Sequence, residues 1–171
     1  MIRIIGIDPG SRCTGFGIIE SDGIKSRYIH SGFIKVQGDE LAEKLGYIFA
    51  ELSLVIKEWQ PEVMAVEQVF VGKNVDSALK LGQARGAAIC AGVNAGLSVG
   101  EYSPRTIKKA VVGRGAADKT QMQEMMRIIL KLTQKLQSDE ADALAVALCH
   151  AHSNTRLGQI HKQIKNTGAG W

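Results

Sequence analysis

The 171-residue chain contains only three cysteines, Cys13, Cys90 and Cys149, which lie far apart and follow no recognisable spacing. Such cysteines are typical of reduced thiols in a cytosolic protein rather than of a disulfide framework. No apolar run reaches the ~18 residues that a membrane helix needs. Near the N-terminus, Asp8 interrupts the apolar run too early for a secretory signal peptide. We therefore expect a cytoplasmic protein with no membrane partner.

Several catalytic and metal-binding patterns are also missing. The sequence shows no Ser-His-Asp or Cys-His arrangement and no phosphate-binding loop with its lysine. The segment CHAH at residues 149–152 suggests zinc, but His150 and His152 would point to roughly opposite sides of a helix. Cys149 and His152 could share an ion, yet two ligands do not make a structural zinc site. A zinc protein is therefore not expected.

The composition is that of one globular domain with a mild basic bias. Hydrophobic residues make up 45% of the chain, and 21 Lys and Arg face 17 Asp and Glu. The net charge of +4 is compatible with a nucleic-acid partner but does not demand one. Residues 1–152 should form the domain. Residues 153–171 are polar, basic and glycine-containing, which favours a flexible tail.

The hydrophobic pattern predicts an α/β protein with a mixed five-stranded sheet flanked by helices. The first and fourth strands should lie parallel, joined by a right-handed crossover. Asp118 should open one helix through a capping box, and Ser138 should cap the last helix. The expected strands are residues 3–7, 14–20, 26–36, 63–66 and 97–102, and the expected helices are 39–59, 76–95, 104–111, one from 118 and 139–152.

Two of the expected strands end in a carboxylate. Asp8 closes the apolar run IIGI within GIDPGSRCTGFG, and Glu67 closes the strand at 63–66. If these strands are parallel neighbours, both acids emerge at the same edge of the sheet, where open sheets bind ligands. Each acid has a simpler interpretation, because Asp8 could be a turn aspartate and Glu67 a solvated strand end.

A second pair of acids lies in SDEADALAVALCHAH. Asp139 and Asp142 are three residues apart and share one face of a helix, whose alanines would let it pack closely on the sheet. Asp139 alone could complement the helix dipole, but Asp142 interrupts an apolar stretch. Four clustered carboxylates need a counter-charge, and Mg²⁺ suits oxygen ligands best. Two such ions about 3.5–4 Å apart can promote phosphodiester hydrolysis.

Three stretches together resemble the RuvC family of Holliday-junction resolvases. They are, in order, GIDPGSRCTGFG, VEQVFVGKNVDSALKLGQARGAA and SDEADALAVALCHAH, and the similarity covers about residues 1–152. The resemblance implies an RNase H-like fold and a homodimer that cuts four-way DNA junctions in recombination and repair. The cuts would be paired nicks in two strands of like polarity. The implied cofactor is one or two Mg²⁺ per subunit, for which Mn²⁺ can substitute. Branch-migration proteins RuvA and RuvB are the implied partners.

The resemblance also assigns roles to individual residues. Phe70 matches a loop aromatic that acts at the opened centre of the junction, although it could instead pack on the core. Lys108 and Lys119 match lysines near the scissile phosphate. The chain departs from the family in LTQKLQSD, where prolines are frequent, and at Glu140, which would add negative charge beside the site. The implied catalytic and metal-binding residues are Asp8, Glu67, Asp139 and Asp142.

Other basic residues are candidates for DNA contacts, although each alone could be a solvated surface charge. Lys119 is the exception, because it lies at an expected helix start, where backbone N–H groups favour phosphate. The further candidates are Lys73, Lys80, Arg85, Arg105, Lys108, Lys109 and Arg114.

Two glycines within one expected helix indicate close packing. Gly82 and Gly86 each cost about 1 kcal/mol relative to alanine in a helix interior, so a close neighbour should offset that cost. The neighbour could be the protein's own sheet or the same helix of a second subunit. A two-fold dimer would suit a substrate with two equivalent strands.

Three other functions share part of this pattern. An actin-like sugar kinase or ATPase also begins with a GIDxG hairpin, but it needs two lobes and this chain supplies one. A non-catalytic junction-binding module would avoid acids that face phosphate. An RNase H-type ribonuclease would share the core, and only the resemblance and the dimer helix separate it from a resolvase.

Overall fold

The computed structural model describes residues 1–69, 74–113 and 118–153. Its centre is a five-stranded sheet in the order β3-β2-β1-β4-β5. The first three strands are antiparallel, whereas β4 runs parallel to β1 and β5 parallel to β4. The predicted mixed sheet, with its parallel first and fourth strands, is confirmed. The strands are β1 (Ile2–Asp8), β2 (Cys13–Ser21), β3 (Ser26–Lys35), β4 (Val63–Glu67) and β5 (Ser98–Tyr102).

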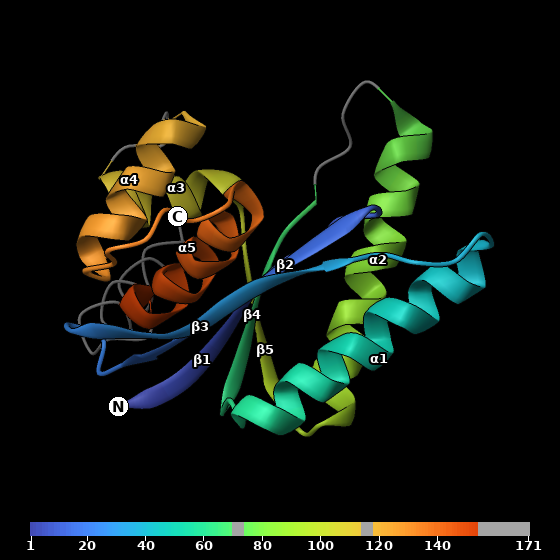
Figure 1. Ribbon diagram of the computed structural model, residues 1–171, viewed down its shortest axis with the longest axis horizontal. Coiled ribbons are helices and arrows are strands. Elements are labelled where there is room, and N and C mark those ends of the chain that lie inside the picture. Colours follow the sequence, from blue (N-terminus) through green and yellow to red (C-terminus); the bar gives the residue numbers. More distant parts are fainter. Residues whose placement is uncertain (70–73, 114–117, 154–171) are drawn as a thin grey trace, which may run out of the picture.

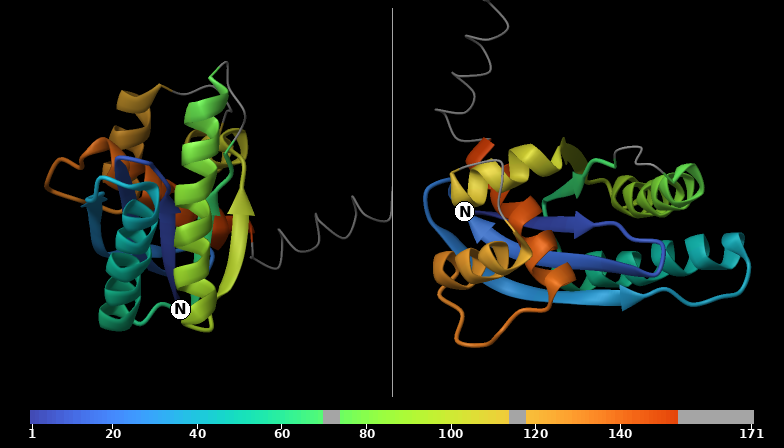
Figure 2. Two further views of the ribbon diagram at one scale, coloured as in Figure 1. Left: turned by 90° about the vertical axis from the view of Figure 1, so that its right-hand side faces the viewer. Right: turned by 90° about the horizontal axis from the view of Figure 1, so that it is seen from above.

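Helices cover both faces of the sheet (Figure 1). One core lies between the sheet and the pair α1 and α2, which run side by side (Figure 2, left). The other core lies between the sheet and α3, α4 and α5. Within the described ranges, no helix combines the length and the apolar character that crossing a membrane requires. The helices are α1 (Leu41–Trp59), α2 (Val75–Asn94), α3 (Pro104–Val112), α4 (Lys119–Ile129) and α5 (Ser138–Ser153).

The helix starts follow local capping chemistry. Asp118 accepts a hydrogen bond from the Gln121 N–H at 2.8 Å and Gln121 bonds back, so the predicted capping box is confirmed. The prediction for Ser138 was wrong, because Ser138 is the first residue inside α5. The Glu140 carboxylate instead accepts the N–H of Gln137 at 3.0 Å, which satisfies a donor just outside the helix.

Helix α5 lies very close to the sheet because glycines leave room for it. A Cβ atom on Gly6 would lie 2.1 Å from the Ala143 carbonyl oxygen, and one on Gly15 would lie 2.2 Å from the Asp139 carbonyl oxygen. The alanines of α5 are buried on the same surface. The predicted close packing is confirmed, and it sets the two acids of α5 over the ends of β1 and β2.

Candidate active site

The two strand-end acids are neighbours in the structure. Ile7 of β1 pairs with Val66 of β4 in parallel register, so Asp8 and Glu67 follow at the same edge of the sheet. Ile7 and Val66 belong to the core under α1 and α2. Because side chains alternate along a strand, Asp8 and Glu67 point to the opposite face, which α5 covers.

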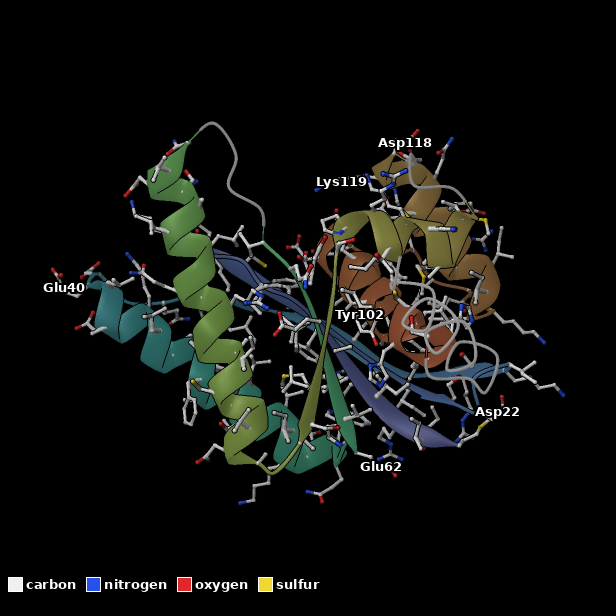
Figure 3. All side chains as sticks on the ribbon, turned by 180° about the vertical axis from the view of Figure 1, so that it is seen from behind. Asp22, Glu40, Glu62, Tyr102, Asp118 and Lys119 are labelled. Atoms are coloured by element: carbon white, nitrogen blue, oxygen red, sulfur yellow. The ribbon has the colours of Figure 1, made fainter. Side chains whose placement is uncertain are left out.

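These acids line a cavity of about 310 Å³ together with residues of three helices. Asp142 comes from α5, Lys108 from α3 and Lys119 from the first turn of α4. Figure 3 shows Lys119 at the start of α4, at the opposite end of the molecule from Glu62, which precedes β4. Three of the four acids and both lysines singled out in the sequence thus come together. The full lining is Asp8, Glu67, Pro104, Ile107, Lys108, Lys119, Met122 and Asp142.

The carboxylates strongly perturb one another. Burial raises the pKa of Asp8 to about 8, and the negative charges of Glu67 and Asp142 add to the effect. The Asp8 carboxyl donates a hydrogen bond to Glu67. Burial also raises the pKa of Glu67, and the bond from Asp8 opposes this rise. Asp8 and Glu67 therefore hold one proton between them near neutral pH.

The two lysines supply positive charge that the acids lack. Burial raises the pKa of Asp142, whereas the charge of Lys119 lowers it. Lys108 and Lys119 both lower the pKa of Glu67. Within the described residues, neither lysine forms an ion pair within 4.0 Å. Their ammonium groups thus face the cavity without being neutralised by a single carboxylate, which suits them to an anionic substrate.

Asp139 lies beside the cavity rather than on its wall. Its main chain packs against Gly15, and its carboxylate bonds the thiol of Cys13. Burial is the main cause that raises the pKa of the Cys13 thiol to about 12, and the hydrogen bond with Asp139 adds to the effect. The charge of Asp139 nevertheless contributes to the raised pKa values of Asp8 and Asp142. The fourth acid therefore interacts electrostatically with the cluster.

The donor set suits a hard cation, although the acids are not gathered around one point. Among the residues that the structure describes, no three His, Cys, Asp or Glu side chains converge closely enough to hold an ion. The proton shared by Asp8 and Glu67 provides part of the charge compensation that a cation would supply. Carboxylate oxygens are the ligands that Mg²⁺ prefers, and burial makes compensation of their charge favourable.

The residues of CHAH have structural surroundings. His150 is buried in α5, and its Nδ1 lies 3.0 Å from the Tyr102 hydroxyl. Cys149 is also buried, and none of the three cysteines forms a disulfide. This segment therefore belongs to the packing between α5 and β5.

Glu140 is not among the residues that line the cavity, and both of its carboxylate oxygens are hydrogen-bonded. Ser31 Oγ donates to one of its oxygens at 3.0 Å, and the Gln137 N–H donates to the other at 3.0 Å. The expectation that Glu140 adds charge beside the site therefore gains no support, because both oxygens are engaged by β3 and by the start of α5.

The other basic candidates within the described residues separate into two groups. Arg105 and Lys109 lie exposed on α3, outside the cavity lining. Lys80 pairs with Asp76 at 2.7 Å, and Arg85 pairs with Glu101, so both are engaged within the chain. Phe70, Lys73 and Arg114, like the tail from residue 154, lie outside the described residues.

The two helix glycines face open space. No described atom lies within 4 Å of a Cβ built on Gly82 or Gly86, so packing on the protein's own sheet is wrong for these positions. The same stripe of α2 carries three exposed apolar side chains, namely Val75 (62% exposed), Leu79 (61%) and Val93 (59%). At the other end of α2, Gly92 does pack on Met64 of the sheet.

Sequence reasoning missed residues that support the site. Gly15 and Gly17 are two apart and therefore lie on one face of β2, where a smooth surface admits a helix. That spacing could have been recognised in the sequence. The contact of Arg85 with the Glu67 main chain had no sequence signal, because it joins an ordinary basic residue to a distant carbonyl.

Comparisons with known proteins agree on one family. The family model described as "Crossover junction endodeoxyribonuclease RuvC" matches residues 4–150. A protein of that name from Pseudoalteromonas atlantica is 55% identical over 170 residues, which cover 99% of this chain and 98% of the relative.

Solved structures agree with the sequence comparison. Thermus thermophilus RuvC is 36% identical, with a TM-score of 0.80 over 91% of this chain and 96% of that one. The same protein in complex with a Holliday junction substrate gives a TM-score of 0.80 at 34% identity and the same coverage. The expected RNase H-like fold is thus confirmed. The match to endodeoxyribonucleases along nearly the whole chain decides against the kinase, the ribonuclease and the non-catalytic module. The chain belongs to the family of RuvC crossover junction endodeoxyribonucleases.

Proposed function

We propose that this chain acts as a homodimer that resolves four-way DNA junctions by metal-dependent hydrolysis during recombination and repair. Each subunit would nick one of two strands of like polarity. One observation carries the proposal. Acids from β1, β4 and α5 line a single cavity with Lys108 and Lys119, so carboxylates and cations face the same small volume. A phosphodiester substrate needs both kinds of group.

RuvC nucleases are metal-dependent. We propose Mg²⁺, one or two ions per subunit with Mn²⁺ able to substitute, held by Asp8, Glu67, Asp139 and Asp142 together with water. When bound, the metal would supply an activated water and stabilise the leaving oxygen. Asp8 and Glu67 would give up their shared proton, which frees their oxygens for the ion. Because α5 packs closely on glycines of the sheet, Asp139 and Asp142 should keep their positions during this exchange.

The two lysines would hold the scissile phosphate. Lys108 lies on the α3 side of the cavity and Lys119 on the α4 side. Lys119 is also the first residue of α4, where unpaired backbone N–H groups attract phosphate. Arg105, exposed on α3, and Lys73 would extend the contact along the DNA backbone. These contacts fix the strand relative to the acids without selecting its bases.

We propose that Phe70 acts at the opened centre of the junction. This residue follows Glu67 by three positions, between the end of β4 and the start of α2, and it lies outside the described residues. Bases at an open junction lose stacking partners, and an aromatic ring replaces each at roughly 1–3 kcal/mol. A ring so close along the chain to Glu67 could hold the scissile strand at the cavity.

The exposed stripe of α2 is the surface proposed for the second subunit. Apolar side chains and the open glycines Gly82 and Gly86 would let two copies of α2 approach closely around a two-fold axis. The dimer would then receive junctions from the branch-migration proteins RuvA and RuvB. We place these steps in the cytoplasm, consistent with cysteines that form no disulfide.

The test is cleavage of a synthetic four-way junction with and without Mg²⁺, followed on a denaturing gel. Glu67→Gln, Asp8→Asn, Asp139→Asn and Asp142→Asn should each lower the cleavage rate at least about 100-fold, the scale of losing a group that acts in the reaction. Junction binding should survive, because removing a negative charge does not weaken attraction to phosphate. Glu58→Gln, an exposed change on α1, is the matched control. Cleavage by Glu67→Gln at the wild-type rate would contradict the assignment.

A further inference from the structure

We propose that Arg85 is a positioning residue for cleavage, because it fixes the peptide unit that follows Glu67 and thereby aims the Glu67 carboxylate into the cavity. The inference rests on the proposed function, in which Glu67 is a metal ligand. Arg85 lies on α2, which belongs to the other face of the sheet, and it is absent from the cavity lining.

Both polar groups of the Glu67–Gln68 peptide are bonded. Arg85 Nε donates to the Glu67 carbonyl oxygen at 3.1 Å. The N–H of Gln68 donates to the Tyr102 carbonyl oxygen at 2.8 Å. One bond comes from α2 and the other from β5. A peptide unit is planar, so holding its C=O and its N–H fixes the plane. The orientation of that plane sets the backbone torsion at Glu67 and, with it, the direction of the Glu67 side chain.

The guanidinium itself is held by a second partner. Arg85 Nη2 pairs with the Glu101 carboxylate on β5, and the Arg85 side chain is only 20% exposed. Glu101 and Tyr102 are adjacent in β5, and Tyr102 belongs to the core under α5. Glu101 therefore faces α2, as alternation along the strand requires. Arg85 thus connects α2, β4 and β5 at the edge of the sheet where the proposed metal ligands meet.

This peptide lies where the main chain leaves the sheet. Glu67 is the last residue of β4, and the segment beyond it leads to α2. Without the Arg85 bond, the Glu67 carbonyl would lose its side-chain hydrogen bond, and the peptide would be anchored through the Gln68 N–H. Rotation about the Glu67 torsion would then spread the carboxylate over several directions. If the Glu67 carboxylate is held less firmly, the metal should bind more weakly and the cleavage reaction should be slower.

The experiment compares Arg85→Gln with Arg127→Gln in the 171-residue protein. Arg127 of α4 is a matched control, since it also pairs with a glutamate, Glu124, and bonds a main-chain carbonyl, that of Leu132. Arg85→Gln should slow single-turnover cleavage of a four-way junction by about 10–100-fold, the range for residues that orient metal ligands. Its Kd for the junction should stay within about twofold, and half-maximal cleavage should need more Mg²⁺. Arg127→Gln should change none of these quantities.

A second readout needs no DNA. Mg²⁺ should raise the Tm of the wild-type protein by binding the folded state. The rise should be smaller in Arg85→Gln and smallest in Glu67→Gln. Arg85→Lys keeps the charge but not the fork of donors, so it should give an intermediate rate. Glu101→Gln removes the second partner of Arg85 and should slow cleavage in the same direction but less.

The outcomes separate this inference from the proposed function. If Glu67→Gln cleaves like the wild type, the proposed function fails. If Glu67→Gln is inactive while Arg85→Gln cleaves at the wild-type rate, only the role of Arg85 is wrong. A junction Kd weakened about tenfold by Arg85→Gln, with unchanged Mg²⁺ demand, would make Arg85 a DNA contact instead. Should Arg85→Gln fail to fold, Arg85→Lys and Glu101→Gln decide, and wild-type behaviour of both overturns the proposal.

Discussion

At the scale of single residues, the central feature is the proton shared by Asp8 and Glu67. Two carboxyl groups at adjacent strand ends cannot both ionise cheaply in a buried place, so one keeps its proton near pH 7. A divalent cation would take over the compensation that this proton provides. Metal binding and proton release should therefore be linked, and the metal-free protein should carry a signature of the pair in its stability.

That signature is a pH dependence in EDTA. The pKa of Asp8 rises from an ordinary 3.8 to about 8 on folding, so the folded state holds a proton that the unfolded state has released. The stability contributed by this group must fall as the pH rises between these values. The Asp8→Asn variant has no titrating group at this position. The Tm of Asp8→Asn should therefore rise relative to the wild-type Tm as the pH increases from 5 to 8.5. Each kcal/mol recovered corresponds to about 2–4 °C.

The matched control for the pH experiment is Asp39→Asn, a change at an exposed acid. Its Tm difference from the wild type should stay flat over the same pH range. A constant difference for Asp8→Asn as well would show that the shared proton does not exist. Adding Mg²⁺ should stabilise the wild type most at high pH, where Asp8 gives up its proton at least cost.

Phe70 gives a second prediction at this scale. Phe70→Ala should cut a fully paired junction poorly and retain its Tm and its junction binding. A junction with unpaired bases at the crossover should restore part of the rate, because stacking is then needed less. Phe33→Ala, at a 43% exposed phenylalanine on β3, serves as the control. Equal defects on both substrates, or a lower Tm, would favour packing of Phe70 on the core.

At the scale of elements, the seating of α5 on the sheet decides where half of the acids lie. Gly6, Gly15 and Gly17 present a surface without side chains, and α5 rests on it through backbone atoms. Backbone cannot move aside as a flexible side chain can. Small changes in these glycines should therefore shift the helix or the strands rather than be absorbed locally.

Gly6→Ala tests this seating. The new Cβ would lie 2.1 Å from the Ala143 carbonyl oxygen, so the free energy of unfolding should fall by about 1–3 kcal/mol or more, as for an overpacked core. Gly46→Ala on α1 has no atom within 4 Å and should instead raise it by about 1 kcal/mol. Urea unfolding measures both. An unchanged midpoint for Gly6→Ala would show that α5 is free to lift.

Much of this architecture could be predicted from the sequence, because it depends on local pattern. Apolar runs predicted the strands, helical spacing predicted α1, and the capping-box spacing at Asp118 predicted the start of α4. Asp8 and Glu67 could be placed together because the ends of parallel strands meet, and Asp142 could be placed near them because the alanines of its helix predicted close packing on the sheet. The rest depends on tertiary approach. Ser138 lies inside α5, and the N–H of Gln137 before it is bonded by the Glu140 carboxylate. The carbonyl oxygen that accepts the hydrogen bond of Arg85 lies 18 residues away in sequence.

At the scale of the whole molecule, the exposed stripe of α2 that contains Gly82 and Gly86 is the proposed dimer interface. Gly86→Leu would place a bulky side chain where two helices are proposed to meet. Light scattering should then show the mass of the folded variant falling toward 18.4 kDa. Gly46→Leu makes the same change at an open glycine of α1 and should leave the dimer intact. A folded Gly86→Leu that remained dimeric would locate the interface elsewhere.

The order of the acids along the chain has a consequence for synthesis in the cell. Two of the four proposed ligands, Asp139 and Asp142, lie on α5, the last element that the structure describes. A nascent chain still on the ribosome, or a product of premature termination before residue 139, carries only Asp8 and Glu67. It also lacks the helix that covers them. Under the proposed function, a copy that stops before residue 139 should therefore leave DNA uncut, because it lacks both acids of α5.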